Sequence, residues 1–441
     1  MSSTDNSTDS AKDSRRLRYT VNDKPPLGEA IPLAIQHVFA AFSGIVAVPL
    51  VVGGVLGLPL EDIAFLVSAT LFVSGIATII QTRGFGPVGA RVPMIMGTDF
   101  TFVGPSISVG FASGLPGIFG ATIAGSFIEM FLSRFVRPLR KLFPPAVTGT
   151  VVTLIGLTIL PVAVDWAAGG FGAADYGSTQ NLSLAMFVLV VIMVLNQWGK
   201  GIVSSGSILI GIILGYIVAY PLGLLDFGQI SGASWIAVPN PLKFGVTFKA
   251  SAILAFVAAY LVTTVETIGD LMAVGEAAEQ EVTSEHLERG LLADGVGSFI
   301  AGFFNAGPNT SFSQNVGIIP VTGIASRFVV LIAGIIIAIA GLFPKVGALV
   351  AIMPNPVLGG AGIIMFGMIA AAGIKIYQGV DFNRRNMLVI AVSLGLGMAV
   401  VVRPDILSQL PEDVRTVFAS GITTGTFAAL ILNLVLPKAR E

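Results

Sequence analysis

The chain contains no cysteine, and this absence excludes disulfide bonds, thiolate metal sites and cysteine nucleophiles. Charged residues are also scarce: they make up 11% of the 441 residues, whereas soluble domains carry about 25%. A net charge of -1 argues against nucleic acid or another polyanion as a partner. This shortage of charge, together with 54% hydrophobic residues, indicates a protein that crosses the membrane several times.

The N-terminal segment also lacks something, namely the apolar core of a cleaved signal peptide. Ser, Thr, Asp and basic residues dominate it, and they cannot bury enough apolar surface to fold. We therefore expect residues 1–28 to be a disordered cytosolic tail.

Apolar runs long enough to span a bilayer, about 17 to 25 residues each, follow this tail. Three further segments, 89–112, 286–304 and 308–325, are rich in Gly, Pro, Ser, Thr or charge and would make poor lipid-facing helices. Counting them, the sequence predicts an all-α polytopic membrane protein with about fourteen transmembrane segments. The clear runs begin near Ile31, Glu61, Pro116, Val147, Leu182, Ser207, Ala250, Phe328, Val357, Asn386 and Val417.

The distribution of Lys and Arg tests this count, because basic residues accumulate in cytosolic loops. With fourteen segments and both termini in the cytosol, all but five of the 24 basic residues lie on the cytosolic side. A shift of one segment early in the chain would destroy this asymmetry, so we expect a multi-pass protein of the cell membrane with both termini in the cytosol. The five exceptions are Lys243, Lys249, Lys345, Arg403 and Arg415.

Two segments that lie 210 residues apart resemble each other. FPPAVTGTVVTLIGLTI begins at Phe143 and MPNPVLGGAGIIMFGMI begins at Met353, and the two share Pro, Val, Gly and Ile at matching positions. If each half of the chain holds seven segments, an odd number, the second half enters the membrane in the opposite sense. The pattern therefore predicts a seven-plus-seven inverted repeat. Chance similarity between Gly- and Pro-rich membrane segments is the alternative.

The third segment of each half, 89–112 and 308–325, is interrupted, and paired interruptions point to a binding site at the middle of the membrane. The runs Thr98–Phe102 and Thr310–Asn315 lie between helix breakers and suit short extended pieces. Their backbone groups must pair with each other or with a ligand, because lipid offers no partner. A half-helix starting after each piece would point its positive end at the same place. We expect a pocket there for a planar polar substrate that is anionic or rich in carbonyl groups.

Acidic residues lie inside the apolar runs of the second half. Glu266 and Asp270 are four residues apart, so on a helix both carboxylates lie on one face. Two acids this close in an apolar site cannot both be charged cheaply, so we expect one of them to hold a proton, or the pair to bind sodium. A surface pair at a helix end is the alternative. Asp294 would either function in this site or cap a neighbouring helix, and His37 would either carry a proton or donate a packing hydrogen bond.

Several of these residues resemble the nucleobase/ascorbate transporter family. QNVGIIPVTGIASR, from Gln314, is similar to the family's signature Q-N-x-G-x-x-x-x-T-G. QHVFAAFSGIVAVPL, from Gln36, resembles the motif of the first segment, and VETIGD, from Val265, resembles the acidic motif of the eighth. LADG, ending at Gly295, and GTDFTFV, from Gly97, also fit, so the resemblance covers most of the chain.

The resemblance implies a mobile core domain and a gate domain, the latter also forming a homodimer interface. The core would consist of residues 29–140 (segments 1–4) and 245–345 (segments 8–11). The gate would consist of residues 141–244 (segments 5–7) and 346–441 (segments 12–14 with the C-terminal tail).

The same resemblance implies roles for individual residues. Glu266 would accept hydrogen bonds from the N–H groups of a nucleobase, and Gln314 would pair with its carbonyl or N–H groups. Ser313 and Phe100 would offer backbone amides, and the Phe100 ring would stack on the base. Four further residues would organise the site or couple substrate to the cation: Asp270, Asp294, Asn315 and His37.

The residue at the position of Gln314 separates branches of the family. Gln resembles the xanthine and uric acid branch, whereas the uracil branch carries Glu, and a neutral amide both donates and accepts hydrogen bonds. Asp99 departs from the family pattern, which has a small neutral polar residue such as Asn or Ser there. An extra acid would repel a urate anion, bind a cation or donate a hydrogen bond as the protonated form. We expect Asp99 to lie at the substrate.

The expected function is import of a purine nucleobase, xanthine or uric acid, by proton or sodium symport, with no cofactor and no metal site. A uracil or pyrimidine permease of the same family is one alternative. An inorganic anion transporter of the related core-and-gate fold is another, and Glu266 beside Gln314 disfavours it because an anion site needs no acid. An intramembrane enzyme is disfavoured because the sequence shows no paired nucleophile and base and no HExxH motif.

Overall fold

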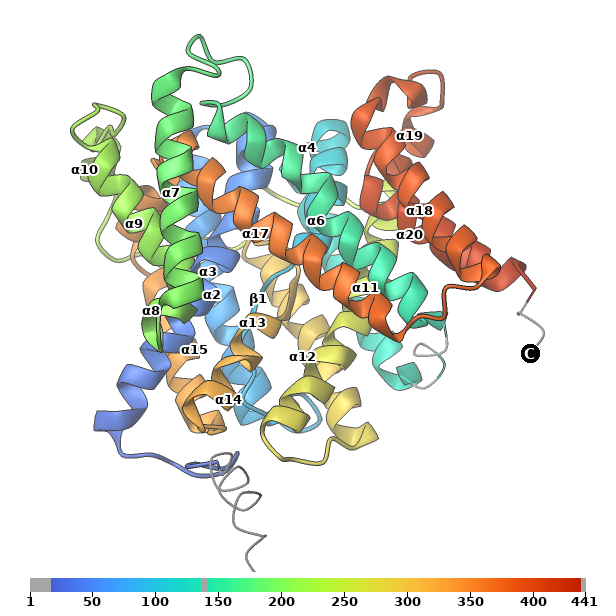
Figure 1. The fold of residues 1–441 in the computed structure, drawn as a ribbon, viewed down its shortest axis with the longest axis horizontal. Helices are drawn as coiled ribbons and strands as arrows, with labels where there is room; N and C mark the ends of the chain where they lie inside the picture. Colours follow the sequence, from blue (N-terminus) through green and yellow to red (C-terminus); the bar gives the residue numbers. More distant parts are fainter. Residues whose placement is uncertain (1–16, 137, 139–141, 438–441) are drawn as a thin grey trace, which may run out of the picture.

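The fold was obtained as a computed structural model of the chain, which describes residues 17–136, 138 and 142–437 (Figure 1). Within these ranges, eight helices are long and apolar enough to cross a membrane, or ten if each of two bent helix pairs counts as one span. The chain is therefore a multi-pass helical membrane protein. Outside the described residues lie 1–16 of the predicted tail and eight predicted cytosolic basic residues: Lys12, Arg15, Arg16, Arg137, Arg140, Lys141, Lys438 and Arg440.

The helices of the first half are α2 (Leu27–Val55), α3 (Leu60–Arg83), α4 (Val103–Leu132), α6 (Pro145–Ala167), α7 (Thr179–Trp198), α8 (Ile202–Ser205), α9 (Ser207–Ala219) and α10 (Gly228–Gly232). Those of the second half are α11 (Ala250–Ala277), α12 (Ser284–Phe303), α13 (Ser313–Val316), α14 (Ile318–Thr322), α15 (Arg327–Gly341), α16 (Pro344–Ala351), α17 (Asn355–Ile376), α18 (Arg384–Val402), α19 (Glu412–Phe418) and α20 (Gly421–Val435). Short 3-10 turns are η1 (Phe100–Phe102), η2 (Ser133–Phe135), η3 (Tyr377–Gly379) and η4 (Pro404–Leu407).

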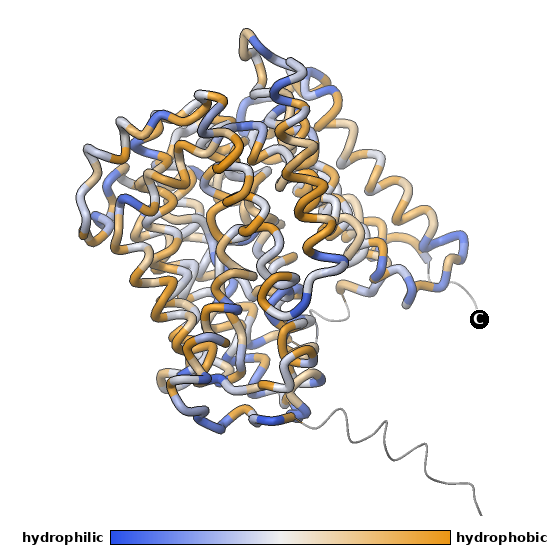
Figure 2. Tube along the Cα trace, turned by 60° about the vertical axis from the view of Figure 1, so that its left-hand side comes forward, coloured by the Kyte–Doolittle hydropathy of each residue, from blue (hydrophilic) through white to orange (hydrophobic). Residues whose placement is uncertain are grey.

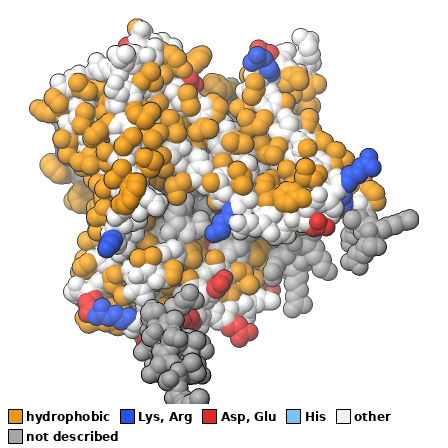
Figure 3. Space-filling model, viewed as in Figure 1, with side chains coloured by type: hydrophobic (Ala, Val, Ile, Leu, Met, Phe, Trp, Pro, Cys, Tyr) orange, Lys and Arg blue, Asp and Glu red, His pale blue; other side chains and the backbone are white. Residues whose placement is uncertain are grey.

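Apolar residues dominate the middle of the long helices, and hydrophilic residues gather in the connections at their ends (Figure 2). Hydrophobic side chains likewise cover most of the upper part of the face in Figure 3, where charged side chains are few. In water such a surface would be an aggregation hazard, whereas in lipid tails it is the expected exterior.

Several predicted segments differ from the observed helices. Helix α4 is interrupted at Gly114, whose φ of 65° lies in the left-handed region, so it consists of two helical stretches that meet between the predicted segment 89–112 and the run predicted to begin near Pro116. The segment predicted to begin near Val417 coincides with a bend of 82° between α19 and α20. The polar segment 286–304 is a regular helix, α12, because its polar residues pack inward against α4 and α11 rather than toward lipid.

The helices form two bundles (Figure 1). In the first bundle α2, α3, α4, α11, α12 and α15 pack around two short strands, and in the second α6, α7, α9, α17, α18 and α20 pack together. Apolar side chains fill both bundles and the contact between them. The short helix α16 packs on α3, and α19 lies against α4 and α11.

Helices α6 and α17, which carry the two similar segments, run side by side and antiparallel in the second bundle (Figure 1). Glycines permit this close approach: a Cβ on Gly156 would lie 2.4 Å from the Ala370 nitrogen, and one on Gly359 would lie 2.1 Å from the Ala167 nitrogen. These glycines therefore let two helices of the same bundle pack closely.

The two expected extended pieces are strands β1 (Met96–Thr98) and β2 (Asn309–Ser311), which pair antiparallel with Met96 opposite Ser311. Their backbone groups therefore pair with each other, as the absence of lipid partners requires. Both strands end earlier than predicted. The residues after Thr98 turn into η1 because the Asp99 side chain accepts a hydrogen bond from the Thr101 N–H at 2.8 Å.

The half-helices that follow the two strands are unequal. After β1, η1 leads directly into the 30-residue helix α4. After β2, the chain forms only two short helices, α13 and α14, separated at Gly317 and ended by Gly323 in the left-handed conformation, with φ 70°. A helical segment therefore begins after each strand, as predicted, but the second, Ser313–Thr322, is much shorter than α4.

Candidate functional site

The strand pair lies at the centre of the candidate site, and hydroxyl groups tie β2 to α11. The Thr263 hydroxyl donates to the Thr310 hydroxyl oxygen at 2.8 Å, and the Thr267 hydroxyl lies 3.3 Å from the same atom. The Ser311 hydroxyl donates to a carboxylate oxygen of Asp270 at 2.7 Å. Asp270 is thus bound to the strand that precedes α13, in a position to organise the site.

Asp294 reaches the same group of hydroxyls from α12. It is fully buried and accepts a hydrogen bond from the Thr267 hydroxyl through Oδ2, and its Oδ1 has no partner among the described residues. Asp294 therefore lies behind Thr267 rather than beside the expected substrate. It contacts α11 instead of capping a neighbouring helix, which favours a place in the site.

Glu266 makes fewer hydrogen bonds to described residues than Asp270 or Asp294 does. Its Oε2 is buried and accepts no hydrogen bond from a described residue. The negative charges of Asp99, Asp270 and Asp294 all act on it. Because Asp270 is buried and hydrogen-bonded, the alternative of a surface pair at a helix end is wrong. Glu266 remains able to accept hydrogen bonds from a ligand.

Asp99 follows β1 and lies close to Thr263 and Glu266 of α11. Oδ1 caps η1 through the Thr101 N–H, whereas Oδ2 is buried with no hydrogen-bond partner among the described residues. The capping role explains why an acid fits this position, since a helix N-terminus favours negative charge. The second oxygen leaves Asp99 able to meet a ligand.

Helix α13 presents its residues in two directions. Asn315 is buried, and its amide nitrogen donates to the His37 carbonyl oxygen at 2.9 Å and lies 3.2 Å from the His37 Nδ1. Ser313 and Gln314 are exposed. Asn315 and His37 thus hold α13 against α2, an arrangement that supports the packing role considered for His37, and they leave Gln314 free to face a ligand.

Phe100 supplies an aromatic surface at the boundary between the bundles. Its ring meets the Phe366 ring of α17 edge to face, with centroids 5.7 Å apart and planes at 75°. The backbone N–H groups of Phe100 and Ser313 begin their helical turns and make no hydrogen bond within the described residues. Two donors therefore accompany the acceptors of Glu266 and Gln314.

Two glycines on helices near the site have no close neighbours. A Cβ placed on Gly269 of α11 or on Gly367 of α17 would meet nothing within 4 Å. The Ser108 hydroxyl of α4 donates to the Thr416 carbonyl of α19 at 2.6 Å, which ties the first bundle to α19.

Sequence reasoning missed two residues near this site. No feature of the sequence pointed to Phe366, because a phenylalanine inside an apolar helix has the pattern of an ordinary core residue. Glu129 of α4 is fully buried and has no hydrogen-bond partner for either carboxylate oxygen among the described residues. The rule that singled out Glu266, an acid inside an apolar run, applies equally to Glu129 in GSFIEMFL and would have found it.

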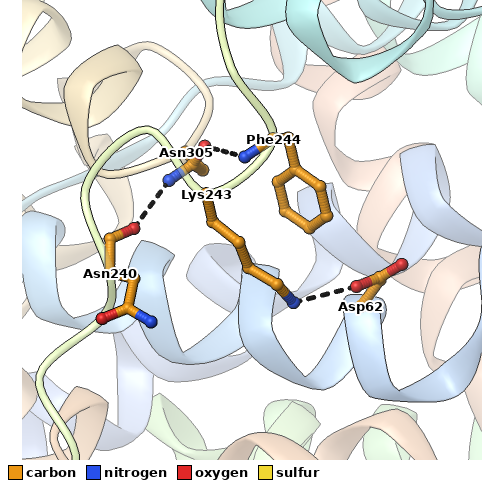
Figure 4. Close-up of polar contacts among 5 residues, drawn as sticks. All are labelled: Asp62, Asn240, Lys243, Phe244 and Asn305. Carbon is orange, nitrogen blue, oxygen red and sulfur yellow. Dashed lines mark hydrogen bonds and ion pairs between the residues drawn. The ribbon is translucent and has the colours of Figure 1, made fainter.

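A cavity of about 780 Å³ lies away from these residues, between the start of α3, the 232–243 connection and α16. At its edge the Lys243 amine is 2.9 Å from the Asp62 carboxylate (Figure 4). The same amine lies over the rings of Phe65 and Phe244. The Asn305 side chain fastens the same connection through its bonds to the Asn240 carbonyl and the Phe244 N–H. None of the predicted site residues lines this cavity.

Comparison with known proteins places this arrangement in a family. Residues 28–406 match the permease family. The chain is 55% identical to a putative purine permease of Clostridium perfringens, over 96% of this chain and 94% of that one. It is 41% identical to the xanthine permease of Bacillus subtilis, over 92% and 94% of the two chains, and 42% identical to a uric acid transporter of Escherichia coli, over 92% and 86%.

Among solved structures, the transmembrane domain of the cyanobacterial bicarbonate transporter BicA is similar, with a TM-score of 0.59 over 90% of this chain and 100% of that one. The sequence identity is 14%, so this likeness shows the fold alone. The relatives matched over nearly their whole length are permeases and transporters rather than enzymes. The chain belongs to this permease family, the nucleobase/ascorbate transporter family that its motifs resemble, in its xanthine and uric acid branch.

Proposed function

We propose that the protein imports a purine nucleobase, xanthine or uric acid, together with a proton or sodium ion. The observation that carries this proposal is a set of hydrogen-bonding groups without partners among the described residues, on α11 and in the turns that follow the two strands, namely Glu266, Gln314 and the N–H groups of Phe100 and Ser313. Relatives that match nearly the whole chain are named for xanthine and uric acid.

These groups suit an oxidised purine. Glu266 would accept from ring N–H groups, while Gln314 would donate to a carbonyl and accept from a neighbouring N–H. The two backbone amides would bind carbonyl oxygens. The Phe100 ring would stack on the base at an orientation set by Phe366.

Transport would proceed by alternating access between the bundles. The mobile core would be residues 29–140 and 245–345, which contain the strand pair, and the gate would be 141–244 and 346–441. Substrate and cation would neutralise the buried acids, which lowers the cost of carrying them past the apolar gate.

The proposed architecture has fourteen segments in a seven-plus-seven inverted repeat. The antiparallel pairing of β1 with β2 and of α6 with α17 supports it, because elements related by an in-plane axis run in opposite directions. We further propose a homodimer through the gate domain, a location in the cell membrane and both termini in the cytosol.

Two other functions receive less support. An inorganic anion transporter would share the fold of BicA, but the acceptor oxygens of Glu266 and Asp99 suit the ring N–H groups of a nucleobase, which an inorganic anion lacks. A uracil permease would share the family, but Gln314 and the names of the relatives favour purines.

The test is uptake of radiolabelled xanthine into proteoliposomes under separately imposed proton and sodium gradients. Unlabelled urate, hypoxanthine, uracil and sulfate are added as competitors. Saturable xanthine uptake that urate blocks and uracil leaves unchanged is expected, and the effective gradient identifies the coupling ion. Uracil competition would contradict the purine assignment, and sulfate flux without nucleobase uptake would contradict the proposal as a whole.

A further inference from the structure

Glu129 is a buried acid that the proposed substrate site does not use. It lies on α4 with 0% of its surface exposed, and neither oxygen of its carboxylate accepts a hydrogen bond from a described residue. A charged carboxylate without partners in an apolar interior is strongly unfavourable. Something must therefore neutralise Glu129 in the folded protein.

The groups around Glu129 offer no positive charge. Those that act on it are Asp294 and the neutral Ser298 hydroxyl from α12, Asp99 before η1 and Tyr260 from α11. Tyr260 is itself buried and donates its hydroxyl proton to the Thr122 carbonyl at 2.8 Å. Asp294, which is also fully buried, has a further unpaired carboxylate oxygen, Oδ1. Two acids thus share one apolar region and lack counterions there.

The space around the two acids is too tight for a hydrated ion. A Cβ on Gly295, next to Asp294, would lie 3.0 Å from the backbone nitrogen of Met130, next to Glu129. A Cβ on Gly125 would lie 2.1 Å from the Tyr260 ring. Within the described residues, moreover, no three His, Asp or Glu side chains gather where they could hold a metal ion. A proton is the cation that fits.

A continuous set of hydroxyls connects this pair with the proposed substrate site. The Asp294 carboxylate accepts a hydrogen bond from the Thr267 hydroxyl. The Ser311 hydroxyl can donate either to the Thr267 hydroxyl oxygen, at 3.3 Å, or to the Asp270 carboxylate, at 2.7 Å. Asp270 lies one helical turn from Glu266. A change in charge at Glu266 can therefore act electrostatically on Asp270 and Asp294, and Asp294 in turn acts on Glu129.

We propose that Glu129 and Asp294 together hold one exchangeable proton in the core, and that this proton crosses the membrane with the substrate. The inference rests on the proposed function and adds the place where the coupling ion is carried. Glu129 is a coupling residue that contacts no substrate. A purely structural role would instead require a carboxyl group that stays protonated throughout the cycle.

The test compares Glu129→Gln, a shape-matched neutral side chain, with wild type and with Glu412→Gln, which removes an exposed carboxylate on α19. Each is reconstituted in liposomes and assayed twice. One assay measures xanthine accumulation driven by an inward proton gradient. The other measures exchange of external labelled xanthine for internal unlabelled xanthine at equal pH.

We expect Glu129→Gln to keep exchange and to lose gradient-driven accumulation, which falls to the level without a gradient. Glu412→Gln should match wild type in both assays. Accumulation by Glu129→Gln at the wild-type level would overturn the proposal, and so would loss of exchange in a variant that elutes as a single folded species. Wild-type accumulation that depends only on sodium would also overturn it.

Infrared spectroscopy tests the same proton without any Glu129 variant or transport. Glu266→Gln protein containing carbon-13 glutamate should show an isotope-shifted band of a protonated carboxyl group, and this band should decline as pH rises while the protein stays folded. Its absence, or a band that ignores pH, would overturn the proposal. If wild type fails to transport xanthine, the proposed function fails, and the infrared result still decides whether Glu129 holds an exchangeable proton.

Discussion

Replacement of Glu266 by Gln tests the substrate site most directly. The substitution keeps the shape of the side chain and removes its charge, so ring N–H groups of the substrate would face an amide rather than a carboxylate. A hydrogen bond to a charged group contributes about 1.5 to 3 kcal/mol. At about 1.4 kcal/mol per tenfold change, xanthine affinity should fall by about 10- to 150-fold.

The fold should tolerate this change. The Glu266 Oε2 accepts no hydrogen bond from a described residue, and removing the charge relieves repulsion from Asp99, Asp270 and Asp294. We therefore expect normal expression, normal elution and an unchanged or raised unfolding temperature. Loss of binding accompanied by unfolding would show a structural role instead.

Equilibrium binding of radiolabelled xanthine to purified protein measures the affinity, and proteoliposome uptake measures transport. Uptake by Glu266→Gln should be abolished. Glu412→Gln, with an exposed carboxylate at the far end of the molecule, controls for loss of one acidic residue. Wild-type xanthine affinity in the Glu266→Gln protein would refute the assignment of this residue to the substrate.

Two further predictions concern the supports of the site. Ser311→Ala removes the 2.7 Å hydrogen bond to Asp270 and leaves a buried carboxylate oxygen unpaired. The protein should therefore lose about 1 to 3 kcal/mol of stability, and an unchanged thermal unfolding curve would count against this role. Gly359→Ala places a Cβ 2.1 Å from the Ala167 nitrogen and should destabilise the folded protein by about 1 to 3 kcal/mol. Gly367→Ala, on the same helix, places a Cβ with nothing within 4 Å and should leave stability unchanged. Equal unfolding temperatures for the two variants would contradict the packing argument.

Much of the molecule was predictable because membrane proteins impose simple constraints. Hydropathy located most helices, and the Gly- and Pro-rich interruptions located both strands, because lipid forbids unpaired backbone outside such places. Glu266, Asp270, Asp294 and Gln314 followed from the cost of polar groups at membrane depth. These signals depend on short stretches of sequence, so they can be recognised without knowledge of the tertiary structure.

Other features depend on contacts that a single sequence does not display. The end of β1 is set by the Asp99 side chain turning back onto Thr101, and this choice between strand and cap is invisible to residue alternation. The helical segment after β2 similarly ends early because Gly323 takes the left-handed conformation, with φ 70°. Phe366 enters the site only because α17 packs beside Phe100.

The strand pair also has a consequence for synthesis. Residues Met96–Thr98 find their partners only in Asn309–Ser311, more than 200 residues later. At about 5 to 20 residues per second, the ribosome needs about 10 to 40 s to supply them. During that time the earlier strand has unpaired N–H and C=O groups that lipid cannot satisfy. The first half must therefore wait beside the insertion machinery, or in contact with water, until its other half arrives, and truncation before Asn309 should leave a chain that quality control removes.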